Sequence, residues 1–340
     1  MSTPSSSAAN GSAALHTTAR PRSGHWTPPR LASAASSRLV PPPCRASSGS
    51  PTPSPRRRPT DHAAVKLDQG AAAPSVPVID VGGTDHGAVV AAVRRAAEEW
   101  GAFLVTGHGV PQEVTSATLR AARAFHDADG GEGSEKARLF SREPGKSVWY
   151  NTNFDFYDSP VANWRDSLYI NMDPNPPDPA ELPENCRDVF FDYGKHLKRL
   201  QETLFGLLSE ALGLNQSYLS DIGYNQGQMV YCHYYPPCPQ PELAIGMVPH
   251  SDWGFLTILL QNEVDGLQVL HNEEWVNVVP IPGAFIVNLG DLLQMLSDDR
   301  FKSCEHRVLA TSVGPRVSIG SYPTRWFNQD LWPHQGATVP

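Results

Sequence analysis

Long apolar runs are missing from the 340-residue sequence, which nowhere approaches the roughly 18–20 consecutive apolar residues of a transmembrane helix. Cysteine is scarce as well. The five cysteines are irregularly spaced and form no CxxC pair, which argues against a disulfide framework and favours a reducing compartment. There is no GxSxG motif and no complete P-loop, so neither a serine hydrolase of that type nor a P-loop nucleotide-binding protein is predicted.

Acidic residues and lysine are absent from residues 1–60, a stretch that contains eight arginines. Since the whole chain has a formal net charge of −8 and this stretch contributes +8, the remaining 280 residues carry −16. An acidic body repels a phosphate backbone, so we expect no nucleic-acid partner for the folded part.

Residues 1–74 consist mainly of Ser, Ala, Pro, Arg and Thr without apolar periodicity. Such a segment cannot bury enough surface to offset the entropy of ordering, so we expect it to be disordered. Its Arg-rich, Ser-rich and acid-free composition is also typical of an organelle transit peptide. Two alternatives stay open: a cytoplasmic protein with a plain extension, or a plastid protein with a targeting segment.

The region 75–180 mixes β-branched segments with amphipathic ones. It is expected to contain two strands and two helices, in the order 75–83 (strand), 86–101 (helix), 102–110 (strand) and 111–125 (helix). Pro111 suits the first position of the second helix, where the missing N–H would have no partner anyway. Residues 181–224 are expected to form a long support helix at 191–214 and its connection, with an apolar face made by Leu197, Leu200, Leu204, Leu207 and Leu208.

The region 225–325 changes to short β-rich segments, several of them separated by Pro and Gly. They lie at 228–235, 255–261, 266–271, 274–280, 284–290, 306–310 and 316–322. Many short strands with turns between them predict a β-sandwich or barrel. Residues 326–340 form a tail without this pattern.

The stretch PHSDWGFLTILL, residues 249–260, contains His250 and Asp252 at the start of an apolar, strand-like run. In an extended chain, residues i and i+2 point to the same side, so this pair offers a nitrogen and an oxygen to one metal ion. A histidine-x-aspartate pair also occurs by chance, and a surface histidine is the alternative.

A third ligand is available in His306, which opens its own predicted strand. Two histidines and one carboxylate on one face of Fe(II) leave three positions open for other ligands. Ten residues further on, Arg316 and Ser318 again share one side of a strand. A guanidinium and a hydroxyl in that arrangement suit a carboxylate, which Arg binds as a planar fork.

These residues, in this order, resemble the plant 2-oxoglutarate- and Fe(II)-dependent dioxygenases. The stretches HYYPPCPQPELAIG, GLQVL and GDLLQMLSDDRFKSCEHRVLA strengthen the likeness, which covers residues of about 75–322. NFDFYDSPVANWRDSLY, residues 153–169, is similar to the subgroup that contains 1-aminocyclopropane-1-carboxylate oxidase homologues, deacetoxyvindoline 4-hydroxylase and benzoxazinoid hydroxylases.

The resemblance implies an α+β fold with a double-stranded β-helix, or jelly-roll, core and supporting N-terminal helices. It implies Fe(II) on His250, Asp252 and His306, and the distal carboxylate of 2-oxoglutarate on Arg316 and Ser318, with Tyr235 at the other end of that cosubstrate. The expected enzyme is a monomer that oxidises a small molecule with dioxygen, is supported by ascorbate, and has no membrane partner.

Some positions depart from the family pattern. His233 stands where the family usually has asparagine, and we interpret it as a neighbour of the site; a contact with the cosubstrate or with iron is the alternative. Phe154 and Tyr322 match positions that line the substrate pocket in relatives, which favours an aromatic or terpenoid-like substrate, although either could be a core residue. The two ends of the chain are unlike the family, which affects closure of the pocket.

Two other functions remain open at this point. One is an ethylene-forming oxidase that uses ascorbate and needs no 2-oxoglutarate. The other is a catalytically silent relative, which the complete set of ligands disfavours.

The targeting alternative can be tested with a fluorescent fusion. If residues 1–70 act as a transit peptide, the fusion accumulates in plastids because its basic, acid-free composition is what import recognises. Diffuse cytosolic fluorescence, matching that of the unfused fluorescent protein, would show that residues 1–70 are not a plastid transit peptide.

Overall fold

A computed structural model describes residues 74–142, 145–152 and 163–324. The predictions for residues 1–73, for Phe154 and for the tail 326–340 therefore lie outside the described residues. None of the helices in the described ranges is both long enough and apolar enough to cross a membrane.

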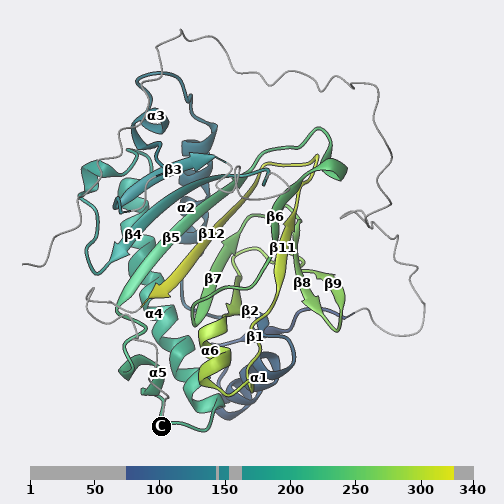
Figure 1. The fold of residues 1–340 in the computed structure, drawn as a ribbon. Coiled ribbons are helices and arrows are strands. Elements are labelled where there is room, and N and C mark those ends of the chain that lie inside the picture. Colours follow the sequence, from purple (N-terminus) through teal and green to yellow (C-terminus); the bar gives the residue numbers. More distant parts are fainter. Residues whose placement is uncertain (1–73, 143–144, 153–162, 325–340) are drawn as a thin grey trace, which may run out of the picture. The chain divides into compact units, whose positions relative to one another are not determined.

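Two β-sheets form the centre of the fold (Figure 1). The larger sheet has the strand order β1-β2-β10-β7-β12-β5-β4-β3, and the smaller has the order β6-β11-β8-β9. The strands of the larger sheet are β1 (Val78–Asp80), β2 (Ala102–Thr106), β3 (Val148–Thr152), β4 (Asp166–Asp173), β5 (Gly227–Tyr235), β7 (Leu256–Gln261), β10 (Phe285–Leu289) and β12 (Arg316–Thr324). Those of the smaller are β6 (Ile245–His250), β8 (Leu267–His271), β9 (Glu274–Asn277) and β11 (His306–Leu309).

The inner faces of the two sheets share one apolar core. Tyr235 and Leu259 from the larger sheet pack with Val269 and Val308 from the smaller. Strands β1 to β4, from the N-terminal region, extend the larger sheet at both edges, so the halves of the chain build one sheet. The predicted α+β architecture with a jelly-roll core is confirmed.

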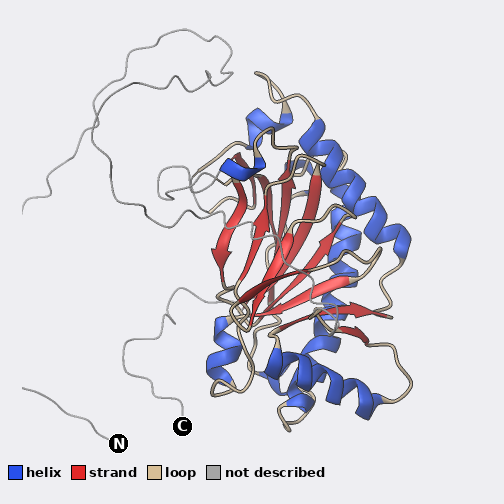
Figure 2. Cartoon of the chain, turned by 90° about the vertical axis from the view of Figure 1, so that its right-hand side faces the viewer, coloured by secondary structure: helices blue, strands red, loops and turns tan. Residues whose placement is uncertain are grey.

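Helices cover the outer face of the larger sheet (Figure 2). They are α1 (His86–Glu99), α2 (Gln112–Asp127), α3 (Glu135–Leu139), α4 (Arg187–Ala211), α5 (Tyr218–Asp221) and α6 (Asp291–Leu296), with short 3₁₀ turns at Pro179–Glu181 and Pro241–Leu243. The predicted support helix is α4. Its five expected leucines are all buried, with Leu197, Leu204 and Leu208 fully so.

Some elements differ from the sequence prediction. Pro111 is the N-cap of α2 rather than its first residue, with extended backbone at ψ 141°, and the helix begins at Gln112. Helix α4 begins at Arg187, four residues earlier than expected, because Phe190 extends its buried face. Helix α6 interrupts the all-β region that the sequence predicts, and strands β3, β4 and β6 were not predicted as such.

Gly101 makes the turn between α1 and β2. Its φ is +66°, and a Cβ there would lie 2.4 Å from the carbonyl oxygen of Lys302. Its N–H donates to the Ala96 carbonyl at 3.0 Å, which closes the end of the helix.

We predict that Gly101→Ala lowers the free energy of unfolding by about 2–4 kcal/mol, because left-handed strain adds to a backbone clash. Gly109→Ala is the matched control, since Gly109 has φ +74° and a Cβ added there would meet no heavy atom within 4 Å, so it should lose only about 1 kcal/mol. Urea unfolding of both variants measures this; equal losses would contradict the role of the clash.

Candidate metal and cosubstrate site

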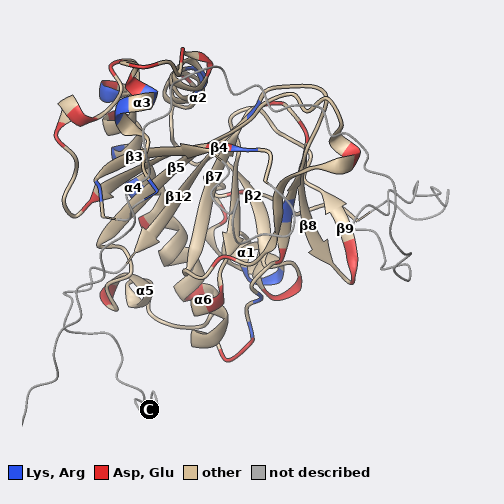
Figure 3. Cartoon of the chain, turned by 45° about the horizontal axis from the view of Figure 1, so that its top comes forward, with Lys and Arg blue, Asp and Glu red and all other residues tan. Residues whose placement is uncertain are grey.

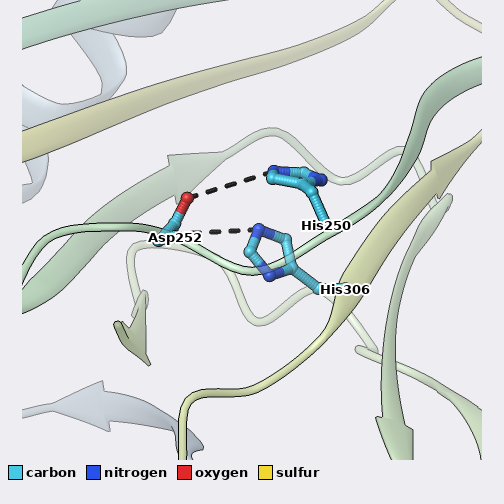
Figure 4. Close-up of side chains that lie close together, drawn as sticks. All are labelled: His250, Asp252 and His306. Carbon is cyan, nitrogen blue, oxygen red and sulfur yellow. Dashed lines mark ion pairs between the residues drawn. The ribbon is translucent and has the colours of Figure 1, made fainter. Parts of the chain in front are cut away.

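Two histidines lie opposite each other on neighbouring strands of the smaller sheet. His250 is the last residue of β6 and His306 is the first of β11, and the antiparallel register pairs them directly. Their ring centroids are 4.3 Å apart (Figure 4). The strand pairing thus places both imidazoles at one end of the sheet.

Asp252 reaches the same place from a connection. It does not share the start of one strand with His250, as the sequence suggested: β6 ends at His250, and β7 begins only at Leu256. The chain turns here because α6 holds it, with the Asp291 N–H donating to the Asp252 carbonyl at 2.8 Å. One carboxylate oxygen lies 3.9 Å from His250 Nε2, and the other lies 3.9 Å from His306 Nε2 (Figure 4).

Backbone carbonyls determine which ring nitrogen of each histidine is free. His250 Nδ1 lies 2.9 Å from the Val248 carbonyl, and His306 Nδ1 lies 3.1 Å from the Cys304 carbonyl. A carbonyl can only accept, so each Nδ1 carries a hydrogen, and Nε2 is the nitrogen that offers a lone pair to a metal. Burial, and then the neighbouring His306, lowers the pKa of His250, so that ring is neutral at pH 7.

Asp252 is oriented by a residue that the sequence did not single out. Thr257 Oγ1 donates to Asp252 Oδ2 at 2.5 Å, and both side chains are buried. The signal was the alternation of β7, which turns Thr257, Leu259 and Gln261 to one face. Such a donor fixes one carboxylate oxygen and leaves the other exposed to the metal position.

The three donors fit Fe(II). Two imidazole nitrogens and a carboxylate oxygen lie within 4.8 Å of one another, and in the described part of the chain no other such group of His, Cys, Asp or Glu side chains occurs. Two histidines and one carboxylate are the donor set of non-haem iron oxygenases, which leave further positions open.

Arg316 is a buried cation beside this cluster. Charged residues otherwise lie mostly on helices and connections, and the strands carry few of them (Figure 3). Arg316 is 1% exposed, and within the described ranges no carboxylate lies within 4.0 Å of its guanidinium. Burial lowers the pKa of Arg316, which measures the cost of removing this cation from water.

The guanidinium is held by neutral groups, and one of its three nitrogens has no hydrogen-bond partner. It donates to Ser318 Oγ at 3.1 Å and to Gln261 Oε1 at 2.7 Å, whereas its Nε has no partner. Tyr235 lies opposite Arg316 in the β5–β12 register, with its ring centroid 5.1 Å from the guanidinium carbon. A buried cation without a counter-ion is stabilised by a bound anion, which fits the carboxylate of 2-oxoglutarate.

His233 lines the same pocket but lies outside the three-donor group. Its Nδ1 is 2.8 Å from Ser167 Oγ. Burial, followed by the charges of Arg165 and Arg316, holds the pKa of His233 well below its usual value, so the ring is neutral. The pocket that joins the iron ligands to Arg316 is also lined by apolar side chains: Met247, Leu259, Leu267 and Val308.

Comparison with known proteins agrees with this geometry. Residues 226–322 match the 2OG-Fe(II) oxygenase superfamily, and residues 76–192 match the family described as non-haem dioxygenase in morphine synthesis N-terminal. The chain is 46% identical over 253 residues to 1-aminocyclopropane-1-carboxylate oxidase homolog 1 of Arabidopsis thaliana, covering 73% of this chain and 68% of that protein. It is 46% identical over 250 residues to a homolog from Solanum lycopersicum, covering 72% and 68%.

A solved structure is similar as well. JOX2 in complex with 2OG, Fe and JA superposes with a TM-score of 0.69 at 32% identity, covering 77% of this chain and 78% of that one. Together with the buried cation and the three donors, this supports Fe(II) and 2-oxoglutarate as the cofactor and cosubstrate.

We predict that His250→Ala, Asp252→Ala and His306→Ala each abolish turnover and reduce bound iron from about one per chain to a small fraction, because two donors hold Fe(II) weakly. Asp252→Glu should also fail, since such sites tolerate displacements of only ~0.5 Å. Iron content after desalting is the measurement. His196→Ala, on α4, is the control and should keep its iron; near-normal iron and activity in a ligand variant would remove that residue from the site.

Proposed function

Because the chain belongs to the 2OG-Fe(II) oxygenase superfamily, we propose that this dioxygenase hydroxylates, or otherwise oxidises, a small specialised metabolite or hormone of a plant. The observation that carries the proposal is the buried guanidinium of Arg316, which has no carboxylate within 4.0 Å in the described part of the chain and lies in one pocket with the three iron donors. JOX2, which is similar in structure and was solved with 2OG, Fe and JA, supports an oxygenase that uses 2-oxoglutarate and iron.

Iron would be held by His250, Asp252 and His306. When bound, Fe(II) and 2-oxoglutarate together supply the activation of dioxygen, and the cosubstrate leaves as succinate and carbon dioxide. The histidine Nε2 lone pairs already face the carboxylate of Asp252, since both Nδ1 atoms are occupied by carbonyls. The protein therefore needs little reorganisation to accept the metal.

The distal carboxylate of 2-oxoglutarate would take the place of a counter-ion at Arg316. Ser318 adds a hydroxyl donor, and Gln261 fixes the guanidinium from the other side through its acceptor oxygen. Tyr235, across the strand pair, would contact the other end of the cosubstrate. Leu259, Leu267 and Val308 keep the space between them apolar, which excludes water from the reaction.

We predict that the purified protein forms succinate only when 2-oxoglutarate is present. Arg316→Ala should raise the dissociation constant for 2-oxoglutarate by roughly 30- to 5000-fold, or about 2–5 kcal/mol, because the distal carboxylate would then be buried without its cation. Arg316→Lys should recover only part of the loss, since an ammonium does not bind two oxygens as a fork. Isothermal titration gives the affinities.

Iron content separates this result from a general loss of structure and should stay near one per chain in both variants. A wild-type enzyme that is indifferent to 2-oxoglutarate but needs ascorbate would instead indicate an ethylene-forming type of oxidase. Iron binding without any turnover would indicate a catalytically silent relative.

A further inference from the structure

A second guanidinium stands beside the pocket, and the proposed function does not use it. Arg165, just before β4, is half-buried. Within the described ranges its side chain has no carboxylate within 4.0 Å and no hydrogen-bond acceptor. A partly desolvated cation in this position is a place for an anionic ligand.

The segment that carries this arginine is fixed to the iron-binding strand. Asn163 forms a β-bridge with Ile245, and the Trp164 N–H donates to the Ile245 carbonyl at 2.7 Å. Asn163 Oδ1 in turn accepts from the Val248 N–H at 3.0 Å. The Val248 carbonyl also accepts a hydrogen bond from His250 Nδ1. Val248 of β6 therefore contacts both the segment that carries Arg165 and the iron ligand His250.

We infer that the side chain of Arg165, which is not itself among the residues that line the pocket, is directed toward it. Two residues further on, Ser167 faces the inner side of the sheet, where it contacts His233, and alternation along an extended chain puts Arg165 on that side too. Electrostatics agree with this direction. Burial is the main cause of the lowered pKa of His233 and Arg165 is the next, and the same charge opposes the rise that burial causes in the pKa of Tyr322.

Aromatic rings continue along the same inner face. Trp149 on β3, Tyr169 on β4 and Tyr231 on β5 lie side by side in register, with ring centroids 4.8 and 4.7 Å apart. On β12 the register continues with Gly320, and Tyr322 folds back over it to lie 4.6 Å from Tyr231. We call these four aromatic residues the aromatic row; through Tyr322 it reaches the pocket.

We propose, building on the oxygenase function above, that the substrate is a planar aromatic carboxylic acid whose carboxylate binds Arg165 and whose ring stacks on the aromatic row. The guanidinium supplies a charge-assisted fork, and Tyr322, the member of the aromatic row that lines the pocket, supplies aromatic contact area. Arg165 precedes β4 and Tyr169 lies on it, four residues further on, or about 13 Å along an extended chain, and the long arginine side chain reduces the distance that the ligand has to span.

The test compares 2-naphthylacetate with 2-naphthylacetamide, which has the same ring and nearly the same shape but no charge. Each is titrated into the full-length enzyme loaded with Fe(II) and 2-oxoglutarate without dioxygen, and the visible absorption of the iron complex reports binding. Wild type should bind the acid at least about 10-fold more tightly than the amide. Arg165→Gln should weaken the acid by about 10- to 30-fold and leave the amide unchanged, and Arg165→Lys should fall between.

Matched variants distinguish the contribution of the Arg165 charge to binding from that of the aromatic ring and from an effect on 2-oxoglutarate affinity. Arg120→Gln removes an exposed arginine from α2 and should behave as wild type. Tyr322→Leu should weaken acid and amide by the same factor, because both carry the ring. Arg165→Gln should keep the wild-type affinity for 2-oxoglutarate, in contrast to Arg316→Ala; a loss there would assign Arg165 to the cosubstrate and overturn the proposal.

Equal affinity of the wild type for acid and amide, or binding of neither, would overturn the proposal as well. The proposed function is judged separately, by succinate formation. If a neutral metabolite drives 2-oxoglutarate-dependent succinate release, the function stands and the acid specificity fails. If no 2-oxoglutarate is consumed under any condition, the function itself fails.

Discussion

The pairing of β11 with β6 is the constraint on which the site depends, because its register sets His306 directly opposite His250. A slip of one residue would turn one imidazole to the other face of the sheet. Each ring is then locked by the carbonyl two residues before it, at Val248 and at Cys304. The strand pairing thus positions both imidazole rings, and the two carbonyls leave Nε2 of each ring available to a metal. Asp252 is then positioned by the turn that hydrogen-bonds to α6.

The larger sheet has two faces of different chemistry. Its helix-covered face is apolar, as Leu168, Cys232 and Ile319 show. Between these residues, alternation along the strands turns Ser167, His233 and Ser318 to the inner face, where the register aligns them across β4, β5 and β12. Burying such groups is costly unless they find partners, and Ser167 with His233, and Ser318 with Arg316, provide them. The fold can therefore support a polar pocket next to an apolar core.

Local patterns in the sequence predicted much of this. Helical periodicity located α4, and the i, i+2 spacing put Arg316 and Ser318 on one side of β12. No local pattern in the sequence indicates which distant strands pair with each other. Strands β3 and β4 join the sheet through β5, whose residues follow their β4 partners by 55 (Asp173 and Gln228) to 68 (Asp166 and Tyr234) positions, and no local period marks them as strands. Asp252 was misplaced for a similar reason, since the turn that carries it is held by α6, about 40 residues further on.

The two arginines differ in burial, and that difference suits two different ligands. Arg316 is fully enclosed, so an anion there loses its water entirely and is held by a cation whose side-chain hydrogen bonds go to the neutral Ser318 and Gln261. Arg165 is half-buried and keeps part of its hydration, so it can release an anion more readily. With 2-oxoglutarate in place, the charge of Arg316 is compensated, and Arg165 becomes the uncompensated cation at the pocket. The acidic substrate that we propose would then be drawn to the outer position, which leaves the inner one to the cosubstrate.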